Sequence, residues 1–489
     1  MQTSRRWCFR AVVLSGLAVV LVWQVISRSL VAYLAAMAPE AALILGPTNP
    51  TALVNLADKR LNLDLAEKDT KPAGTTGRDR VSHDDADSIL EASGRIPAFA
   101  MLAYEGANAN RNPDPAGRPE DPSGPAERLP SSSPAVETSE QIRAWAELAL
   151  LNDPLNARAL RILGQLADDA ADEERAAKLM RGAANRSVRE SVAVHWLMQK
   201  SLEKEDYIPA IHYADVLLRT RPRYAEHVMP ILAQMAENKE ASGELKKLLA
   251  ENPPWRAEFF SALLHSISDA RTPLDLLLSI KDAPSPPTAA ELNAYLNFLI
   301  EHKFYELAHY AWLQFLSPVQ LNAAGLLFNG SFEFVPSGLP FDWVIAPGSG
   351  VSIDIVARPM QDGQHALFME LGHGRVNFGG ITQMIMLSPG SYQLKGKFKG
   401  QIIGRRGFEW RVTCAGGQTT PIGKSPMVTG VTPAWQEFEF FFTVPDVGCR
   451  AQHLRLELAA RSASEQLVSG SLWYDELNIS RLPESENPT

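Results

Sequence analysis

The sequence predicts a multidomain protein made of a membrane-spanning N-terminal helix, an α-helical array and a C-terminal all-β sandwich. Three observations lead to this fold class. An uncharged apolar run fills residues 11–27, helical spacing rich in Ala and Leu continues from about 138 to 315, and short alternating runs separated by Gly and Pro follow from about 326. The 489 residues are enough for two or three domains.

The composition disfavours two classes of function. The formal net charge is −9 and no strongly basic stretch occurs, which argues against nucleic acid as a partner. The three cysteines, Cys8, Cys414 and Cys449, form no CxxC motif and no Cys/His pattern of the zinc type. A metal site built on thiolates is therefore not expected.

The N-terminus carries the signals of a membrane anchor. Three arginines within residues 1–10 precede the run AVVLSGLAVVLVWQVIS, and the apolar character resumes after Arg28. By the positive-inside bias, we expect a cytoplasmic tail at 1–10, a signal anchor at 11–34 and the remainder outside. This predicts a single-pass protein of a bacterial inner membrane, with the bulk of the chain periplasmic. The alternative is a cleaved signal peptide, because LAAMA offers small residues near a cut site.

Residues 35–325 are predicted to form a helical array. Four segments align when they are stacked on their turn positions: LALLNDPLNARAL, RGAANRSVRESVAV, VLLRTRPRYAEHV and KLLAENPPWRAEF. The aligned residues Pro154, Val188, Pro222 and Pro253 are 34, 34 and 31 residues apart. A period near 34 resembles that of tetratricopeptide repeats, in which helix pairs bury their apolar faces by stacking on each other. The alternative is a generic helical bundle.

The tetratricopeptide resemblance implies close helix contacts and a surface for proteins. Small residues fit the contacts, with Gly164 in the first helix of a pair and Ala176 and Ala210 in following helices. Arrays of this kind usually present a groove to another protein. Protein partners are therefore predicted for this part of the chain.

An insert is predicted to split one repeat. Residues 68–134 contain few large apolar side chains, and seven prolines lie between Pro113 and Pro134, a composition that predicts disorder. We expect residues 51–64 to supply the first helix of a pair and 139–152 to supply the second. Long insertions at loop tips are tolerated because closure entropy grows slowly with length.

Ten β-rich runs within residues 326–482 predict an all-β sandwich, followed by a flexible tail at 483–489. The runs are GSFEFV, FDWVI, GVSIDIVA, HALFMEL, GITQMIML, YQLKGKFKG, GFEWRVTC, WQEFEFFFTV, HLRLELAA and SLWYDELNI. Alternation of apolar and polar residues, as in LRLEL and QEFEFFF, is typical of strands with one buried face. A sandwich is favoured over a barrel.

The order of motifs in this part resembles a known family. FNGSFEF is followed by GLPFDWVI, LSPGSYQLKGKFKG and the terminal GSLWYDELNIS. This order resembles the jelly-roll carbohydrate-binding modules of the galactose-binding-like superfamily. The resemblance implies a jelly-roll sandwich with polysaccharide as its ligand, although the same scaffold serves other ligands and purely structural roles.

The same resemblance implies a structural calcium ion. In many such modules a glutamate of the opening motif and an aspartate of the closing motif hold calcium, and these match Glu333 and Asp475. Here Asp475 is followed by Glu476, where two aspartates are common. Strand alternation also places Asp475 in one row with Trp473 and Leu477, where an unpaired buried carboxylate would be costly.

Cys414 and Cys449 are the two cysteines outside the membrane segment. An oxidising compartment favours a disulfide between them. This bond would close a loop of about 35 residues and contribute about 3 to 4 kcal/mol. The alternative is a pair of reduced thiols in a cytosolic domain.

Aromatic side chains are candidates for contact with sugar rings. The tryptophans considered are Trp343, Trp410, Trp435 and Trp473. Trp410 is the predicted ligand-binding residue, because it lies among Glu409, Arg411 and two further arginines, where an exposed ring could stack on a ligand. Trp343 and Trp473 are expected in the core.

No sequence motif predicts an enzyme. G-x-S-x-G, HExxH and a glycine-rich phosphate loop are absent from the sequence. The sequence therefore predicts a membrane-anchored scaffold whose array binds proteins and whose sandwich binds glycan, in envelope or exopolysaccharide assembly. The alternative is a purely protein–protein scaffold of an inner-membrane complex, with a sandwich that binds no sugar. An unrecognised glycan-processing enzyme is the third hypothesis.

Overall fold

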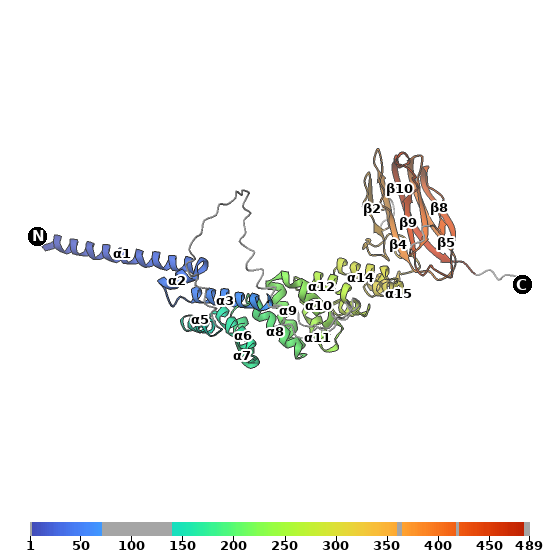
Figure 1. Ribbon diagram of the computed structural model, residues 1–489. Coiled ribbons are helices and arrows are strands. Elements are labelled where there is room, and N and C mark those ends of the chain that lie inside the picture. The colour runs from blue at the N-terminus through green and yellow to red at the C-terminus, as the bar shows by residue number, and fades with distance from the viewer. Residues whose placement is uncertain (1, 71–138, 359–363, 417–419, 484–489) are drawn as a thin grey trace, which may run out of the picture. The chain divides into compact units, whose positions relative to one another are not determined.

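The computed structural model describes residues 2–70, 139–358, 364–416 and 420–483. Figure 1 shows the described helices and strands, coloured along the chain. The chain forms two compact units, residues 1–224 and 225–489. The predicted insert at 68–134 and tail at 483–489 lie almost wholly outside the described residues. Their expected disorder therefore stays a prediction.

The described part of the first unit is helical. Its elements are α1 (Gln2–Met37), α2 (Pro39–Leu45), α3 (Pro50–Thr70), α5 (Ser139–Asn152), α6 (Ala157–Asp169), α7 (Glu173–Arg186), α8 (Ser191–Glu203), α9 (Tyr207–Thr220) and η1 (Pro222–Tyr224). Successive helices pack on each other along the chain. Among the described helices, α1 alone has a window long and apolar enough to cross a membrane, Val20–Met37, a property that spans share with signal sequences.

The helices on either side of the insert pack together. Leu53 and Leu61 of α3 share a buried core with Ile142 and Ala146 of α5. Burial of a large apolar side chain contributes about 1.5 to 3 kcal/mol. The helix pair that the sequence predicts to be split is therefore present as a packed pair.

Helix starts repeat at the predicted period. α6, α8 and α10 (Ala225–Glu237) begin at Ala157, Ser191 and Ala225, which are 34 residues apart. All four predicted turn residues lie between α-helices, with Pro222 at the start of the short 3-10 helix η1. At Gly164, a Cβ would lie 3.0 Å from the sulfur of Met180, so the expected close helix contact is present. The helical array is thus observed, and its assignment to the tetratricopeptide family stays a prediction.

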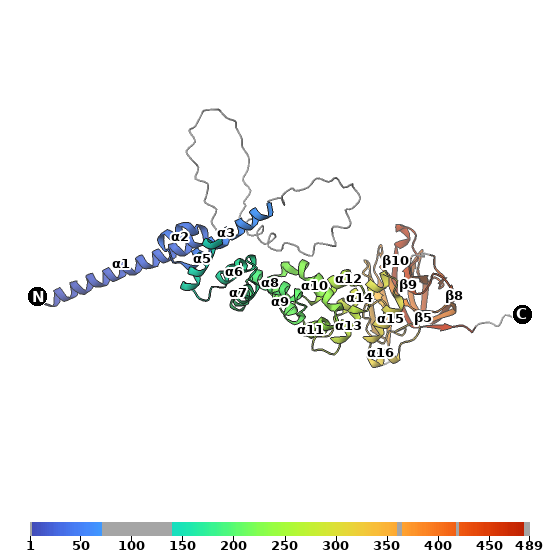
Figure 2. The ribbon, with the colours of Figure 1, turned by 60° about the horizontal axis from the view of Figure 1, so that its bottom comes forward.

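The second unit contains further helices and the sandwich (Figure 2). The helices are α10 (Ala225–Glu237), α11 (Lys239–Ala250), α12 (Arg256–Ser266), α13 (Thr272–Ser279), α14 (Ala289–Glu301), α15 (Tyr305–Gln314) and α16 (Pro318–Asn322). Buried Arg256 donates from Nε to Glu291 at 2.9 Å, and Glu291 also forms the capping box of α14 with Thr288.

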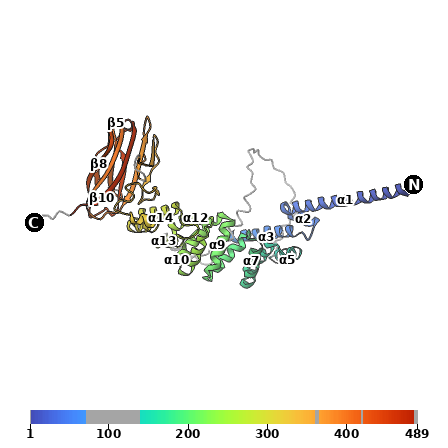
Figure 3. The same cartoon turned by 180° about the vertical axis from the view of Figure 1, so that it is seen from behind.

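The sandwich consists of two antiparallel five-stranded sheets (Figure 3). Its strands are β1 (Val344–Ile345), β2 (Val351–Ala357), β3 (His365–Leu371), β4 (Ile381–Ile385), β5 (Gly390–Gly404), β6 (Phe408–Cys414), β7 (Gly423–Lys424), β8 (Gly430–Val444), β9 (Gln452–Leu458) and β10 (Val468–Arg481). The strand orders are β1-β4-β9-β6-β7 and β2-β3-β10-β5-β8. Nine of the ten predicted runs contain a strand, which confirms the all-β sandwich.

Aromatic side chains fill the space between the two sheets. Trp343 and Trp410 are 1% and 0% exposed, with ring centroids 5.6 Å apart. Nε1 of Trp343 donates to the backbone oxygen of Asn329 at 2.8 Å, and Tyr474 packs edge-on against Trp410. Trp343 is therefore a core residue, as the sequence predicts.

The predicted opening strand GSFEFV is instead an irregular loop. Asn329 and Phe332 have φ angles of +51° and +56°, left-handed conformations that a strand does not contain. The side chain of Asn329 accepts from the backbone nitrogen of Phe334 and donates to its oxygen. The Gly330 oxygen accepts from the backbone nitrogen of Leu477 at 2.9 Å, and a Cβ on Gly330 would lie 2.0 Å from the Leu477 oxygen. The motif thus ties the loop to the last strand.

A β-bulge changes the side-chain faces predicted for GSLWYDELNIS. Between Asp475 and Asn478, β10 contains one residue more than the stretch of β5 with which it pairs. Glu476 has a φ angle of +53° at this point. Leu477 therefore points into the core, whereas Trp473 and Asp475 point to the outer face of the sheet. The prediction of a single row containing Trp473, Asp475 and Leu477 is wrong.

Cys414 and Cys449 are joined by a disulfide, as the sequence predicts. Their Cα atoms are 5.0 Å apart and both residues are buried. The bond links the end of β6 to the segment that precedes β9.

Candidate functional site

A row of side chains crosses the outer face of the second sheet, the face turned away from the first sheet. In strand order this outer row contains Asp354 of β2, Phe368 of β3, Trp473 of β10, Lys399 of β5 and Trp435 of β8. The first four are paired in register from strand to strand, and Lys399 contacts Trp435. The outer row therefore spans all five strands.

Strand alternation fixes the orientation of the outer row. Leu472 and Tyr474 of β10 are fully buried, so Trp473 between them faces outward and is partly exposed. In β5, Phe398 points into the core and Lys399 follows it on the outer face. The fold of the sheet, rather than a loop, positions these side chains.

Direct contacts join the rings of the outer row to one cation. The ring centroids of Phe368 and Trp473 are 4.5 Å apart. Nζ of Lys399 lies 4.8 Å from the ring centroid of Trp473 and 4.9 Å from that of Trp435. Cation–π contacts of this length hold the ammonium group between the two indoles. The outer row thus offers flat apolar rings and a positive charge side by side.

A parallel row of hydrogen-bonding side chains lies next to the outer row. Ser352, Glu370, Ser471 and Gln401 are paired in register across β2, β3, β10 and β5. All four are at least partly exposed. Hydroxyl, carboxylate and amide groups beside apolar rings supply the donors and acceptors that a polyhydroxylated ligand needs.

A cluster of charged side chains lies on the other side of the outer row. Nη1 of Arg358 is 2.9 Å from Asp475 and 3.4 Å from Glu476, and its guanidinium lies 4.8 Å from the ring centroid of Trp435. Lys397 forms a further ion pair with Glu476 at 2.5 Å. Asp475 is therefore buried in contact with an arginine, whereas Glu476 next to it is exposed.

The charge of Asp475 is not fully compensated by this contact. Burial raises the pKa of Asp475 to about 6. The backbone N–H of Glu476 and the charge of Arg358 lower that pKa, while the negative charges of Glu476 and Glu333 raise it. The cluster holds more negative charge than a single guanidinium neutralises.

The calcium ion predicted at Glu333 and Asp475 does not fit these contacts. Glu333 lies 3.1 Å from both the backbone nitrogen and Nδ1 of His365, and Arg358 lies on Asp475. A guanidinium at the carboxylate takes the position that a hard dication would need. Within the described ranges, no group of three or more His, Cys, Asp and Glu side chains could hold a metal ion. Calcium binding stays a prediction.

Trp410 is a core residue, so the prediction that it stacks on a ligand is wrong. Its side chain is 0% exposed. Glu409 and Arg411, which made its neighbourhood polar, pair with each other at 2.6 Å. Alternation along β6 places these two charged residues on the face opposite the indole ring.

Sequence reasoning considered Trp435 as a candidate for sugar contact but did not identify the outer row to which it belongs. Trp473 was expected in the core, and Phe368 and Lys399 were not among the predicted site residues. A signal was present in YQLKGKFKG, where alternation places Lys395, Lys397 and Lys399 on one face. The register that brings Lys399 opposite Trp473 depends on strand order and bulges, which the sequence pattern does not display.

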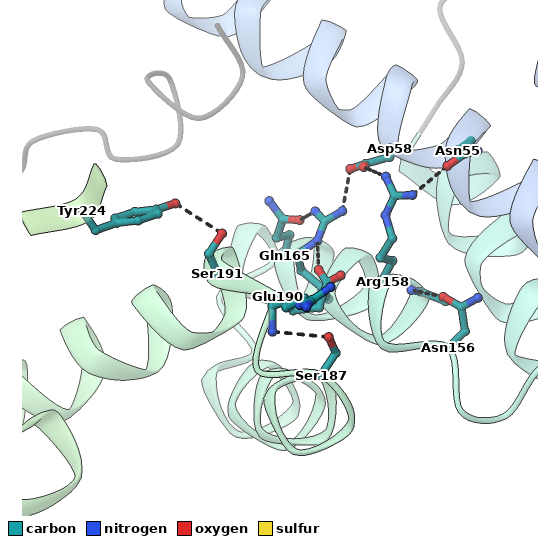
Figure 4. A network of polar contacts seen from close by, with 12 residues as sticks. Asn55, Asp58, Asn156, Arg158, Gln165, Ser187, Glu190, Ser191 and Tyr224 are labelled. Atoms are coloured by element: carbon teal, nitrogen blue, oxygen red, sulfur yellow. Dashed lines mark hydrogen bonds and ion pairs between the residues drawn. The ribbon is translucent and has the colours of Figure 1, made fainter. Parts of the chain in front are cut away.

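The first unit contains a separate polar network (Figure 4). The guanidinium of buried Arg161 contacts Asp58 at 2.6 Å, Glu190 at 3.1 Å and the side chain of Gln165. Arg158 also contacts Asp58, at 2.8 Å. Burial raises the pKa of Asp58, but the charges and hydrogen bonds of the two arginines outweigh this effect and hold it below its ordinary value. The two arginines balance the charges of the two carboxylates within the network, and the network links α3, α6 and the start of α8.

Comparison with known proteins finds similarity for the sandwich. No protein-family model and no curated protein matches the chain. A solved family 4 carbohydrate-binding module is 17% identical over 32% of this chain and 99% of its own, with a TM-score of 0.24. A family 61 module in complex with β-1,4-galactotriose is 19% identical over 32% of this chain and 99% of its own, with a TM-score of 0.22. A β-1,3-glucan-binding family 6 module from Bacillus halodurans is 10% identical over 28% of this chain and 94% of its own, with a TM-score of 0.18.

Proposed function

We propose that this protein is a non-catalytic, membrane-anchored binding protein whose sandwich binds glycan chains on the outer face of the β2-β3-β10-β5-β8 sheet. The outer row is the observation that carries the proposal. With strands about 4.8 Å apart, the row is about 19 Å long and can contact several linked sugar rings. Aromatic rings flanked by hydrogen-bonding side chains are typical of sites for polyhydroxylated ligands.

The helical array serves protein partners in this proposal. Packed helices that repeat every 34 residues present a repeated surface, which is how binding arrays of this type engage other proteins. We propose that these partners belong to an envelope or exopolysaccharide assembly complex. The array would then hold the complex near the glycan that the sandwich binds.

The anchor in this proposal is α1, retained rather than cleaved, with the bulk of the chain in the periplasm. Ala35 is 0% exposed and packs with Ala42 of α2 and Ala52 of α3, and its oxygen accepts from Nδ2 of Asn55 at 2.7 Å. Cleavage at LAAMA would remove Ala35 from this contact. The intact mass of protein extracted from membranes should include the whole of α1, and a mature chain that starts after Ala38 would contradict the anchor.

Affinity electrophoresis of the full-length protein in detergent tests glycan binding. Gels containing a panel of neutral and acidic polysaccharides should retard the protein in at least one case. The double variant Trp473→Ala and Trp435→Ala should migrate without retardation, whereas Phe441→Ala should behave like the wild type. Phe441 is a matched control because it is a 57% exposed aromatic residue on β8, outside the outer row. An unretarded wild type in every gel would contradict the proposal.

A protein–protein scaffold without glycan binding is the second candidate function. One observation favours it, since Arg358 and Lys399 both lie against Trp435 and cover part of that ring with the protein's own cations. Under this alternative the outer row is packing only. The double variant would then lose thermal stability, and no polysaccharide would retard the wild type.

A further inference from the structure

The charge within the outer row carries an inference about the ligand, and it rests on the proposed glycan-binding function. We propose that the ligand is an acidic glycan, whose sugars carry carboxylate groups, and that Lys399 selects it. The proposal depends on three features of Lys399: its missing carboxylate partner, its fixed position and the acidic residues around it.

Lys399 differs from the other cations of this face. Arg358, Lys397 and Lys395 each lie within 4 Å of a carboxylate oxygen. Among the described residues, Lys399 contacts two indole rings and has no carboxylate within ion-pair distance. Its positive charge is therefore available to a ligand.

The position of Lys399 is fixed within the outer row. Its Nζ lies between Trp473 and Trp435, and moving the ammonium away would cost both cation–π contacts. A sugar ring packed against Phe368 or the exposed part of Trp473 brings its substituents next to this ammonium. A carboxylate there forms a charge-assisted hydrogen bond, which is roughly twice as strong as the bond to a neutral hydroxyl.

The acidic residues of the same face restrict where the ligand's charge can lie. Asp354 is at one end of the outer row, Glu370 lies in the neighbouring row, and Glu437 is paired in register with Lys397. A ligand carboxylate beside any of these would be repelled, whereas sugar hydroxyls could donate to them. The carboxylate is therefore expected at Lys399 and the uncharged hydroxyls elsewhere.

Matched polymers test this inference on the full-length protein in detergent. Polygalacturonate, alginate and hyaluronan are each compared with the same polymer after carboxyl reduction, which removes the charge and keeps the chain. The wild type should bind at least one acidic polymer about tenfold more tightly than its reduced form. Lys399→Met should lower the affinity for the acidic polymer to that of the reduced one and leave the latter unchanged. Lys395→Met, on the same strand and face, should keep the wild-type preference.

The outcomes separate this inference from the proposed function. Equal affinity for the acidic and reduced members of every pair would overturn the acidic ligand and leave glycan binding in place. No binding to any acidic, reduced or neutral polymer would overturn both. A Lys399→Met variant that keeps the preference for the acidic polymer would contradict the role of Lys399. At about 1 M salt, where the Debye length falls to about 3 Å, the preference should shrink.

Discussion

Two arginines with little exposed surface, Arg161 in the helical unit and Arg358 in the sandwich, differ in how well the carboxylates beside them are balanced. Arg161 in the helical unit contacts Asp58 and Glu190, and the pKa of Asp58 is held below its ordinary value. Arg358 in the sandwich contacts Asp475, whose pKa burial raises to about 6. The pairing of arginine with carboxylate thus outweighs the effect of burial on the pKa in one unit and does not outweigh it in the other.

The difference follows from the number of cations available to each carboxylate. Asp58 receives hydrogen bonds from both Arg161 and Arg158. Asp475 shares Arg358 with Glu476. Incomplete compensation next to exposed rings is typical of binding sites, whereas a satisfied network is typical of structural packing. The comparison is therefore consistent with a structural role for the helical network and with the binding role proposed for the face of the sandwich.

The largest expected effect comes from breaking the balanced network. Arg161→Leu leaves Asp58 and Glu190 with one buried cation fewer, and should lower the free energy of unfolding of the first unit by about 3 to 5 kcal/mol. Arg158→Leu is the control, because the Arg158 side chain is 46% exposed and its removal should cost under about 1 kcal/mol. Urea unfolding followed by far-UV circular dichroism measures both. Equal losses for the two variants would contradict the structural role of Arg161.

Removing the disulfide should act on the sandwich alone. The bond between Cys414 and Cys449 closes a loop of 35 residues, so the double variant to Ser should cost about 3 to 4 kcal/mol. Hydrogen exchange read by mass spectrometry would show faster exchange in β6 and β9, and unchanged exchange in α6 and α8. Faster exchange in the helices of the first unit would contradict independent stabilisation of the two units.

Opposite pH dependences should appear in the two units. The pKa of Asp475 in the folded protein, about 6, lies above its ordinary value of 3.8. The stabilisation that the protonated carboxyl group gives to the folded state is therefore fully present below about pH 4 and is lost as the pH rises through 6. The loss is on the order of 2 to 3 kcal/mol. For Asp58 the folded pKa is lowered, so its contribution is present above the ordinary pKa and is lost as the pH falls through the folded value.

Hydrogen exchange between about pH 2 and 7, corrected for intrinsic rates, measures this contrast: β10 should lose protection as the pH rises from about 4 to 7, and α6 should lose it only as the pH falls below about 4. Asp475→Asn should flatten the dependence in β10 and leave α6 unchanged. Parallel trends in both elements for the wild type would show that the two carboxylates do not differ as described.

The domain-level organisation was predictable from the sequence because it depends on periodicity. The step of 34 between Pro154 and Val188 matches the helix starts, and alternation in HALFMEL and GFEWRVTC matches β3 and β6. These patterns repeat over many residues, so a local irregularity does not hide them. The disulfide followed from the cysteine count and the expected compartment.

The site was not predictable, because it depends on single-residue irregularities. The left-handed backbone at Glu476 adds one residue to β10 and reverses which side chains face outward after Asp475. The left-handed Phe332 likewise turns the expected first strand into a loop. The burial of Trp410, by contrast, was readable, because alternation in GFEWRVTC places the ring on the face opposite Glu409 and Arg411.

The smallest expected effect concerns the predicted calcium. Because Arg358 already supplies positive charge to Asp475, excess EGTA should leave the unfolding temperature of the wild-type sandwich unchanged. Differential scanning calorimetry with and without 5 mM calcium, as about a thousandfold excess over the protein, measures this. A fall in that temperature on chelation, reversed by calcium and absent in Glu333→Gln, would restore the ion that the family resemblance implies.

The most direct test of the central claim is an oxidation footprint of the tryptophans. Mass spectrometry after brief hydroxyl-radical exposure compares the full-length protein alone with the protein saturated by the polysaccharide that retards it most. Bound glycan should protect Trp473 and Trp435, while Trp410, which is 0% exposed, should resist oxidation in both states. Unchanged oxidation of Trp473 and Trp435 with glycan bound, or protection confined to other residues, would contradict glycan binding on the outer row.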